Sequence, residues 1–376
     1  MINVGYFFWG FLGDRKYNKN QELISTPDGN AFYSWSIISE LQKRNCIVYL
    51  FQDRDYSGFV KENEDLFDAF AKYERYCAYN KIRLFNDLCH DIDMLDFVLI
   101  EWRWEIKGRN DEETRLNDKE NWQPDLWMMK NIIEKCNKSQ VPFIVFDLDY
   151  KLTEEDIKKY NIKYVIELGN KWKENNFVKS KQIKIPFDFS CINEFKLKDK
   201  FENSLVYIGN RYERDWCIDK YIPEDLEDCI VYGNWKEAGR DSESRWEKIK
   251  FGHRLQTSEM QEVYSNSLAT ILLAKEEYCE YEFMTARIIE AIFYGCLPFF
   301  IEEYGSEVVR EYAGRYSYFL TVDSKENLKQ KIEMLLNDIE YRNEIIMYLR
   351  EHLRFMDCKF FVDDMLQLLK GENDEI

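Results

Sequence analysis

The chain has 376 residues, 45% of them hydrophobic and 16% aromatic, which is enough for two domains that each bury a core. Its formal net charge of −18 argues against broad adhesion to nucleic acid or to anionic membranes. Acidic and basic residues are interleaved along the chain, so a local basic surface remains compatible with this total.

The first residues, MINVGYFFWGFLGD, lack the basic leader and the small-residue cleavage site of a signal peptide. No apolar run approaches the length needed to cross a membrane, so we expect a cytoplasmic protein without a membrane partner. The ten cysteines are scattered, with no CxxC pair, and are expected to be reduced thiols rather than zinc ligands.

Strand and helix patterns alternate through the first half of the chain. Short apolar runs predict strands at 2–9, 46–51, 94–101, 141–146, 163–168 and 182–187. Amphipathic spacing predicts helices at about 30–44, within 60–90 and at 124–137, the first of them preceded by the turn residues 26–29. The polar stretch 105–121 is expected to be a long loop, either solvated or part of a substrate-binding segment. There is no GxGxxG motif, so the usual dinucleotide-binding fingerprint is absent.

A second alternating pattern follows the polar stretch 190–203, which we interpret as a linker. Strands are expected at 204–210, 229–234, 269–274, 297–301 and 318–322. Helices are expected within 211–221, at about 258–267, within 281–294 up to the glycine stop, and at 324–336, 338–354 and 358–370. The segment 276–283, EEYCEYEF, is expected to be an acidic loop, and Gly295 is placed to end the preceding helix in a left-handed C-cap.

Each half therefore predicts a Rossmann-like α/β domain. The simplest architecture is two such domains facing each other across a cleft. The expected boundaries are 1–189 for the first domain, 190–355 for the second, and 356–376 for a C-terminal helix that returns to the first domain.

Ligand-binding residue types follow the strands of the second half, where parallel sheets bind their ligands. They are Gly209, Asn210, Arg211, Arg214, Arg254, Glu276, Arg287 and Glu290. Arg287 and Glu290 are three residues apart and share a helix face. By themselves, these two residues favour an ordinary ion pair on a solvated face. The alternative is a nucleotide diphosphate site near the helix start, with Arg287 on the phosphates and Glu290 on the ribose hydroxyls.

In the first half, Asp147 and Asp149 follow the buried strand at 141–146. A carboxylate at this position can face a ligand and act as a base, whereas the alternative is a loop or N-cap aspartate. An alcohol becomes a good nucleophile when a base takes its proton, and a leaving diphosphate needs cations. Asp149 and the arginines together predict sugar transfer from a nucleotide sugar with inversion.

Eight segments carry a resemblance to a known family: TPDGNAFYSWSIISELQ, QPDLWMMKNIIEK, FDLDYKL, IKIPFD, LVYIGN-R, VYGN, HRL and EFMTARIIEAIFYG. In this order, over residues 1–345, they resemble the GT-B glycosyltransferases, and among them the DNA β-glucosyltransferases of T-even phages. The E-A-x3-G-x-x-P pattern that begins in the last segment is shared by many GT-B enzymes.

The resemblance implies a catalytic aspartate at Asp149, with Asp147 as its rival, and it favours ligand binding over the surface ion pair on the helix. The donor-binding residues of the family fall on Gly209, Asn210, Arg211, Arg214, Arg254, Leu255, Glu276 (or Glu277), Arg287 and Glu290. The resemblance also implies UDP-glucose as the donor, no tightly bound cofactor, and Mg²⁺ or Mn²⁺ as a metal that could assist.

The acceptor that the resemblance implies is the hydroxyl of a 5-hydroxymethylpyrimidine, such as 5-hydroxymethylcytosine, in double-stranded DNA. The enzyme would act as a monomer, in the host cytoplasm if it is phage-encoded. Two departures leave this acceptor open: the chain is more acidic than a DNA enzyme suggests, and its stretch 105–121 is longer and more charged than the family's. The alternatives are a GT-B enzyme acting on a cell-envelope glycan, a protein or a small molecule, and a non-catalytic nucleotide- or nucleic-acid-binding module.

Overall fold

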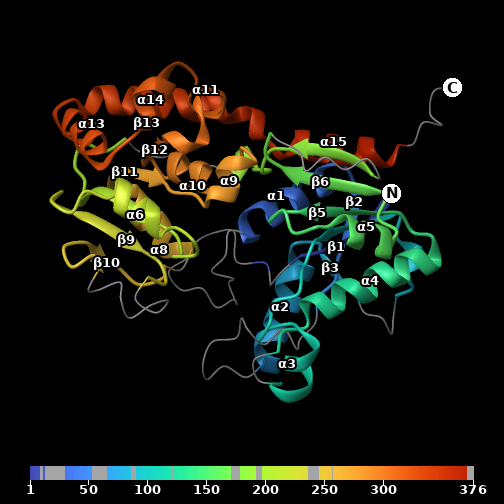
Figure 1. The fold of residues 1–376 in the computed structure, drawn as a ribbon. Helices are drawn as coiled ribbons and strands as arrows, with labels where there is room; N and C mark the ends of the chain where they lie inside the picture. Colours follow the sequence, from blue (N-terminus) through green and yellow to red (C-terminus); the bar gives the residue numbers. More distant parts are fainter. Residues whose placement is uncertain are drawn as a thin grey trace. The chain divides into compact units, whose positions relative to one another are not determined.

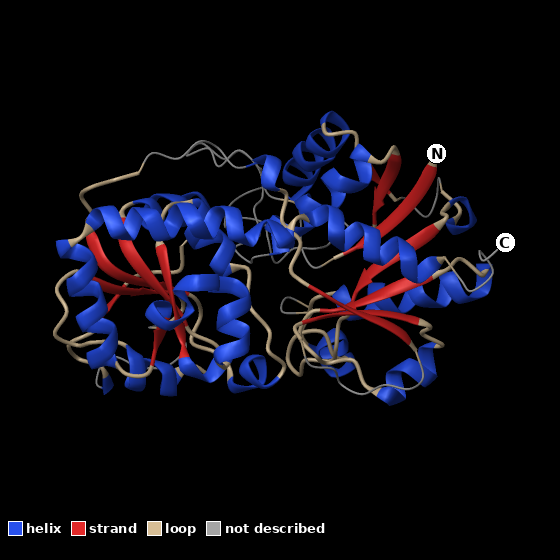
Figure 2. Cartoon of the chain, turned by 90° about the horizontal axis from the view of Figure 1, so that it is seen from above, coloured by secondary structure: helices blue, strands red, loops and turns tan. Residues whose placement is uncertain are grey.

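The computed structural model describes residues 1–8, 12, 30–52, 66–85, 90–119, 122–170, 178–191, 197–235, 245–255 and 257–370. The chain divides into two compact units, Met1–Asp188 with Asp357–Ile376, and Phe189–Met356. Each unit holds a parallel β-sheet with helices on both of its faces (Figure 1, Figure 2). Two parallel sheets flanked by helices confirm the predicted α/β fold.

The sheet of the first unit has the strand order β3-β2-β1-β4-β5-β6-β7, and all of its pairings are parallel. The strands are β1 (Ile2–Phe7), β2 (Cys46–Leu50), β3 (Arg83–Leu84), β4 (Phe97–Glu101), β5 (Phe143–Asp147), β6 (Tyr164–Leu168) and β7 (Lys179–Ile183). Strands β4 and β5 are fully buried and apolar up to their last residues, Glu101 and Asp147. Such continuous apolar strands are typical of a sheet covered on both faces. The carboxylates at their ends therefore stand at the sheet edge where ligands bind.

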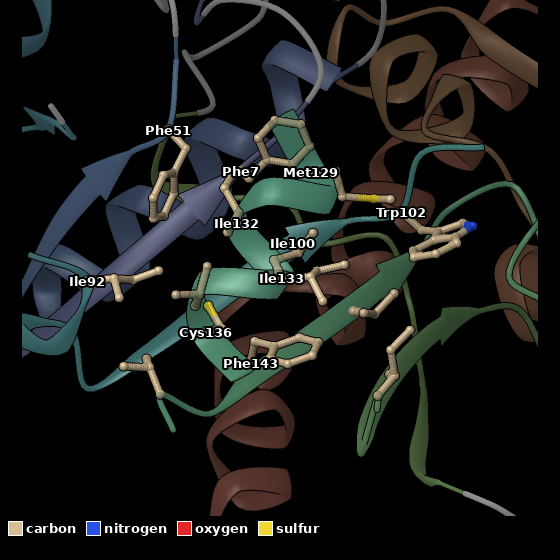
Figure 3. Packing of buried hydrophobic residues seen from close by; sticks show 14 of the residues in the cluster. Phe7, Phe51, Ile92, Ile100, Trp102, Met129, Ile132, Ile133, Cys136 and Phe143 are labelled. Carbon is tan, nitrogen blue, oxygen red and sulfur yellow. The ribbon is translucent and has the colours of Figure 1, made fainter. Parts of the chain in front are cut away.

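In the described residues, the helices of this unit are α1 (Asn30–Lys43), α2 (Leu66–Tyr79), α3 (Glu112–Asn117), α4 (Asp125–Ser139), α5 (Glu154–Tyr160) and α15 (Cys358–Leu369), with the short 3-10 helix η2 (Ile92–Met94). Helix α4 places Met129, Ile133 and Cys136 against the sheet, all with no exposed surface (Figure 3). They pack with Ile100 and Phe143 of the adjacent strands β4 and β5. This cluster fixes the positions of the two strands that end in Glu101 and Asp147.

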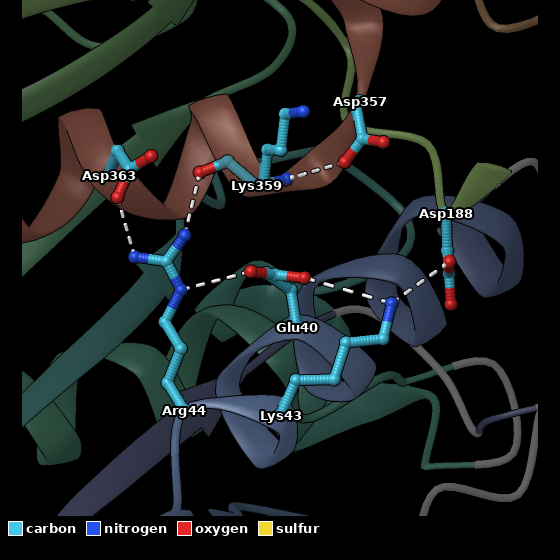
Figure 4. Close-up of polar contacts among 7 residues, drawn as sticks. All are labelled: Glu40, Lys43, Arg44, Asp188, Asp357, Lys359 and Asp363. Atoms are coloured by element: carbon cyan, nitrogen blue, oxygen red, sulfur yellow. Dashed lines mark hydrogen bonds and ion pairs between the residues drawn. The ribbon is translucent and has the colours of Figure 1, made fainter. Parts of the chain in front are cut away.

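Helix α15 packs on α1, β6 and β7 of the first unit. Polar contacts join α1 to it: Arg44 lies 2.6 Å from a carboxylate oxygen of Asp363 and donates to the Lys359 carbonyl at 3.0 Å (Figure 4). The same guanidinium, one residue beyond the end of α1, pairs with Glu40 of that helix at 3.0 Å. On the apolar side, α15 buries Phe361, whose ring contacts Phe146 at a centroid distance of 5.3 Å. The helix therefore supports the strand that leads into Asp147.

The second unit contains a six-stranded sheet with the order β10-β9-β8-β11-β12-β13, again parallel throughout. The strands are β8 (Asn203–Ile208), β9 (Cys229–Tyr232), β10 (Lys250–Phe251), β11 (Ser267–Leu272), β12 (Leu297–Ile301) and β13 (Thr321–Val322). The chain runs outward from β8 in one direction and then returns to place β11 on its other side. This reversal of strand order is the arrangement at which open α/β sheets bind ligands.

The α-helices of the second unit are α6 (Asp215–Tyr221), α8 (Thr257–Ser265), α9 (Glu276–Glu280), α10 (Arg287–Phe293), α11 (Ser306–Ala313), α12 (Ser317–Leu320), α13 (Lys325–Asn337) and α14 (Ile339–His352). Its 3-10 helices are η3 (Phe189–Cys191), η4 (Glu302–Tyr304), η5 (Gly314–Tyr316) and η6 (Leu353–Met356). Helix α10 ends as predicted at Gly295, which has a φ of +79°. The Gly295 N–H donates to the Ile292 carbonyl at 3.1 Å, and the Cys296 N–H donates to Ala291 at 2.8 Å. This Schellman motif leads directly into β12.

Two segments that we expected to be loops contain helices. Within 105–121, the Asp111 side chain accepts a hydrogen bond from the Thr114 N–H at 3.0 Å and caps α3. Within 276–283, helix α9 begins with Glu276 and Glu277, and acidic residues in a first turn stabilise a helix. In both cases the acidic composition that suggested a solvated loop instead marks a helix start.

Three further elements differ from their predicted positions. The helix expected within 60–90 ends at Tyr79, and the chain then turns through Lys81, with a φ of +59°, into β3. The strand expected at 182–187 lies at Lys179–Ile183, because β7 pairs only with β6 and tolerates polar residues. Most of 318–322 belongs to α12, and only Thr321–Val322 is a strand. The turn residues predicted at 26–29 lie outside the described residues.

Within the part of the chain that the structure describes, none of the helices is both long and apolar enough to span a membrane. Eight cysteines whose side chains the structure describes are free thiols, and burial raises the pKa of several of them, including Cys136 and Cys217, to about 12.

Candidate functional site

Gly209 and Asn210 directly follow β8, and Glu276 follows β11. These predicted residues therefore lie in the loops after the two strands at which the strand order of the sheet reverses. The pairing of Leu205 with Ala269 and of Val206 with Thr270 sets these strands side by side. Their carboxyl ends therefore meet at one edge of the sheet.

The loop after β8 is held by the corresponding loop after β9. The Asn234 N–H donates to the side-chain oxygen of Asn210 at 3.3 Å, and the Arg211 N–H donates to that of Asn234 at 3.0 Å. The indole N–H of Trp235 donates to the Gly209 carbonyl at 2.7 Å. Asn234 and Trp235 were not among the predicted site residues, although a second Gly-Asn pair after a second strand was a signal for them.

A side chain at residue 209 would displace its neighbours. A Cβ built there would collide with the Tyr207 hydroxyl and would lie 2.9 Å from Nη2 of Arg287. The Arg287 guanidinium also lies over the Tyr207 ring, with its central carbon 5.9 Å from the ring centroid. The structure therefore brings together two predicted residues, Gly209 and Arg287, that are far apart in the sequence.

Arg287 begins α10, and Glu290 lies one turn further along the same helix. Glu290 is buried, with 4% of its surface exposed, and Arg287 is half-buried. No ion pair within 4.0 Å joins the two in the described part of the chain, so the interpretation as a surface ion pair does not fit them. Burial raises the pKa of the Glu290 carboxyl, and the nearby Arg287 charge opposes the shift. A cation and a carboxylate thus stand close together without neutralising each other through a direct contact.

Arg211 and Arg214 differ in their partners. Arg211 donates from Nε and Nη2 to the two carboxylate oxygens of Asp215, at 2.8 and 2.6 Å. Arg214 is 4% exposed and donates to the backbone carbonyls of Asn210 and Tyr212, at 3.3 and 3.0 Å. Its Nε is buried without a hydrogen-bond partner in the described residues. Arg214 therefore keeps its charge beside the loop that follows β8, whereas the charge of Arg211 is paired with that of Asp215.

The other predicted residues of the second unit have different environments. Arg254 and Glu276 are exposed. Leu255 is buried in a cluster with Val206 and Ile208 of β8, beneath the same loop. Their assignment to a ligand stays a prediction.

In the first unit, the two candidate aspartates have distinct environments. Asp147 is fully buried, and its two carboxylate oxygens accept hydrogen bonds from the N–H groups of Lys151 and Leu152, at 3.0 and 2.9 Å. The loop that these bonds close contains Tyr150, whose φ of +56° is rare for a residue with a side chain. Asp149, in the same loop, is half-buried. Asp147 therefore shapes the loop, and of the two aspartates only Asp149 is accessible to solvent.

Further titratable groups gather where β1 and β4 end. The Tyr6 hydroxyl donates to the fully buried carboxylate of Glu101 at 3.1 Å and also lies 3.2 Å from the Ser34 hydroxyl. The pKa of Tyr33 is raised well above its ordinary value, mainly by burial and then by the charge of Glu101, with a further contribution from Asp149. Glu101 and Tyr33 were not among the predicted site residues, since only the strand order of the sheet brings them near Asp149.

Among the described residues, no three His, Cys, Asp or Glu side chains gather in a way that could hold a metal ion.

No protein-family model matches the chain, and no curated protein matches its sequence. Solved structures do match. The T4 phage β-glucosyltransferase, in a complex with UDP and Mn²⁺, has a TM-score of 0.62 at 14% identity, over 99% of this chain and 100% of that chain. HepE of Anabaena, in a complex with UDP-glucose, has a TM-score of 0.57 at 10% identity, over 98% and 100%.

A third similar structure is a mutant O-GlcNAc transferase of Thermobaculum terrenum, with a TM-score of 0.51 at 11% identity, over 98% of this chain and 66% of that chain. The likeness to all three structures extends over nearly the whole of this chain. The chain has the two-sheet α/β fold of GT-B glycosyltransferases.

Proposed function

We propose that this protein is an inverting glycosyltransferase that transfers a sugar from a UDP-sugar to a hydroxyl group. We further propose that the sugar is glucose and that the acceptor is a 5-hydroxymethylpyrimidine in double-stranded DNA. The observation that supports this most directly is the convergence of the half-buried Arg287 on Gly209, at the point where the strand order of the second sheet reverses. The similar structures with UDP or UDP-glucose support the same choice of donor.

The second unit would bind the nucleotide sugar. Arg287 and Arg214 would neutralise the diphosphate and stabilise the charge that develops on it as the glycosidic bond breaks. Neither has a carboxylate partner within ion-pair distance in the described residues, so their charge is available to an anion. Glu290 would accept hydrogen bonds from ribose hydroxyls, because a buried carboxylate without an ion-pair partner needs donors to satisfy it.

The first unit would bind the acceptor, and Asp149 would act as the base. As the acceptor oxygen attacks the anomeric carbon, its proton passes to the Asp149 carboxylate and the bond between the sugar and the diphosphate breaks. A single displacement of this kind inverts the configuration of the anomeric carbon.

The test is to incubate the protein with UDP-glucose and with either 5-hydroxymethylated or unmodified double-stranded DNA, and to measure UDP release and a hexose mass increase on the DNA. We expect both signals with modified DNA alone. Asp149→Asn should abolish transfer and leave UDP affinity, measured by calorimetry, within about twofold of the wild type. Full transfer by Asp149→Asn would remove this residue from the mechanism.

A second acceptor class has one observation in its favour. A net charge of −18 opposes the approach of DNA, and it does not oppose a glycan, protein or small-molecule acceptor. Binding of UDP-glucose without transfer to either DNA would favour that class. Absence of UDP binding would reject both versions of the proposal. We also expect the enzyme to be a monomer in the cytoplasm, which size-exclusion chromatography with light scattering would check for the oligomeric state.

A further inference from the structure

Tyr207 is the second-to-last residue of β8 and is buried. Its hydroxyl group has no hydrogen-bond partner in the described part of the chain. Its side chain is 1% exposed. An unpaired buried hydroxyl destabilises the folded state, and folded proteins contain few such groups. A phenylalanine would fill the same space without this cost. Tyr264 of the same unit also has a buried hydroxyl that is unpaired in the described residues, so only a hydroxyl whose position also suits a ligand points to a role outside the stability of the unit.

The position of the hydroxyl suggests that role. It lies against Gly209, at the point that a side chain of residue 209 would occupy, and Nη2 of Arg287 lies at the same point. The hydroxyl and the guanidinium do not hydrogen-bond to each other. Two donors that converge without bonding to each other suit a shared acceptor, such as an oxygen of an anionic ligand.

We infer that Tyr207 is a further donor-binding residue, whose hydroxyl donates a hydrogen bond to the same phosphate oxyanion that Arg287 binds. This inference rests on the proposed function, since it assigns Tyr207 to the diphosphate of the nucleotide sugar. The Arg287 guanidinium also packs over the face of the Tyr207 ring, and this contact helps to hold Arg287 beside Gly209. The missing Cβ of Gly209 leaves the space that the Tyr207 hydroxyl and Nη2 of Arg287 approach.

The experiment compares Tyr207→Phe with the wild type in the full-length protein. UDP and inorganic pyrophosphate are titrated by calorimetry, and thermal unfolding is followed for each variant. We expect the affinity for both ligands to fall about tenfold in Tyr207→Phe, as is typical for loss of one hydrogen bond to a charged group. The affinities for UDP and for pyrophosphate should fall by the same factor, because the Tyr207 hydroxyl contacts the diphosphate and not the uridine. The melting temperature should stay the same or rise, because the hydroxyl has no protein partner to lose.

Tyr264→Phe is the matched control. Tyr264 belongs to the same unit, has no exposed surface and also has an unpaired hydroxyl in the described residues, but it packs in the apolar cluster with Leu255 and Cys296. We expect it to bind UDP as the wild type does. Three results would overturn the inference about Tyr207 and leave the proposed function standing. They are a wild-type affinity in Tyr207→Phe, an equal loss of affinity in both variants, and a loss of affinity that accompanies a lower melting temperature. Failure of the wild type to bind either ligand would overturn the proposed function as well.

Discussion

The environment of Asp147 predicts that replacing it by asparagine lowers stability before it affects chemistry. Each carboxylate oxygen accepts one backbone N–H, from Lys151 and Leu152, and the residue has no exposed surface. Asparagine keeps one acceptor and turns an NH₂ group toward the other N–H. Losing one hydrogen bond to a charged acceptor and leaving a buried donor unsatisfied costs about 2–4 kcal/mol.

The expected loss can be measured as a shift in melting temperature. For a protein unit of about 200 residues, each kcal/mol lowers the melting temperature by roughly 2–4 °C, so Asp147→Asn should lower it by about 4–16 °C. Asp149→Asn is the matched control: the residue is half-buried in the same loop, and we expect its melting temperature to stay near that of the wild type. Thermal unfolding followed by circular dichroism would measure both variants, and the glucose-transfer assay would be run well below the melting temperature of each.

The two variants should therefore separate stability from catalysis. Asp147→Asn should be less stable and still transfer sugar, whereas Asp149→Asn should be as stable as the wild type and inactive. An Asp147→Asn protein that melts with the wild type but transfers no sugar would show that the buried aspartate is the base. In that case our assignment of Asp147 to the loop and of Asp149 to the chemistry would be wrong.

Three more predictions follow from individual contacts. Phe361→Ala should lower the free energy of unfolding by about 3–5 kcal/mol, because the side chain is 1% exposed and packs on Phe146. Urea titration would measure this loss, and an unchanged midpoint of urea unfolding would contradict the support that α15 gives to β5. Gly209→Ala should weaken UDP binding at least tenfold in calorimetry, because its Cβ has no space; unchanged affinity would show that this glycine is far from the ligand. Arg214→Lys should weaken UDP binding more than Arg211→Lys does, since only Arg211 is held by a carboxylate, and the reverse order would refute this distinction.

The strands were the most predictable part of the fold. Strand β12 was expected at 297–301 and lies there, and β5 was expected at 141–146 and lies at Phe143–Asp147. A parallel strand covered on both faces must be apolar along its length, so the run of apolar residues in the sequence marks it directly. Strand β7 shows the limit of this signal. Its sequence, KSKQI, is polar because it pairs on one side only, so composition did not reveal it.

The candidate site was predictable only in its strand-end residues. Residues such as Gly209 and Asp149 could be found because they directly follow apolar runs. Asn234 and Trp235 hydrogen-bond to Asn210 and Gly209 between the loops that follow two neighbouring strands. These contacts depend on the pairing of Ile208 with Tyr232. A single sequence does not give that register, so these supporting residues could not be assigned before the fold was known.

The pair Arg211 and Arg214 shows how local spacing could have refined the prediction. Arg211 and Asp215 are four residues apart, a spacing that favours an ion pair on a helix, and the structure contains that pair. Arg214 has no such partner at three or four residues, since Cys217 and Ile218 occupy those positions. The sequence alone could therefore have distinguished an arginine paired with a carboxylate from one without such a partner. The buried Nε of Arg214, which has no hydrogen-bond partner in the described residues, makes this difference a physical one. A buried guanidinium with an unsatisfied donor is stabilised by an anion more than an arginine already bound to a carboxylate is, so Arg214 and not Arg211 should account for most of the electrostatic contribution to diphosphate binding.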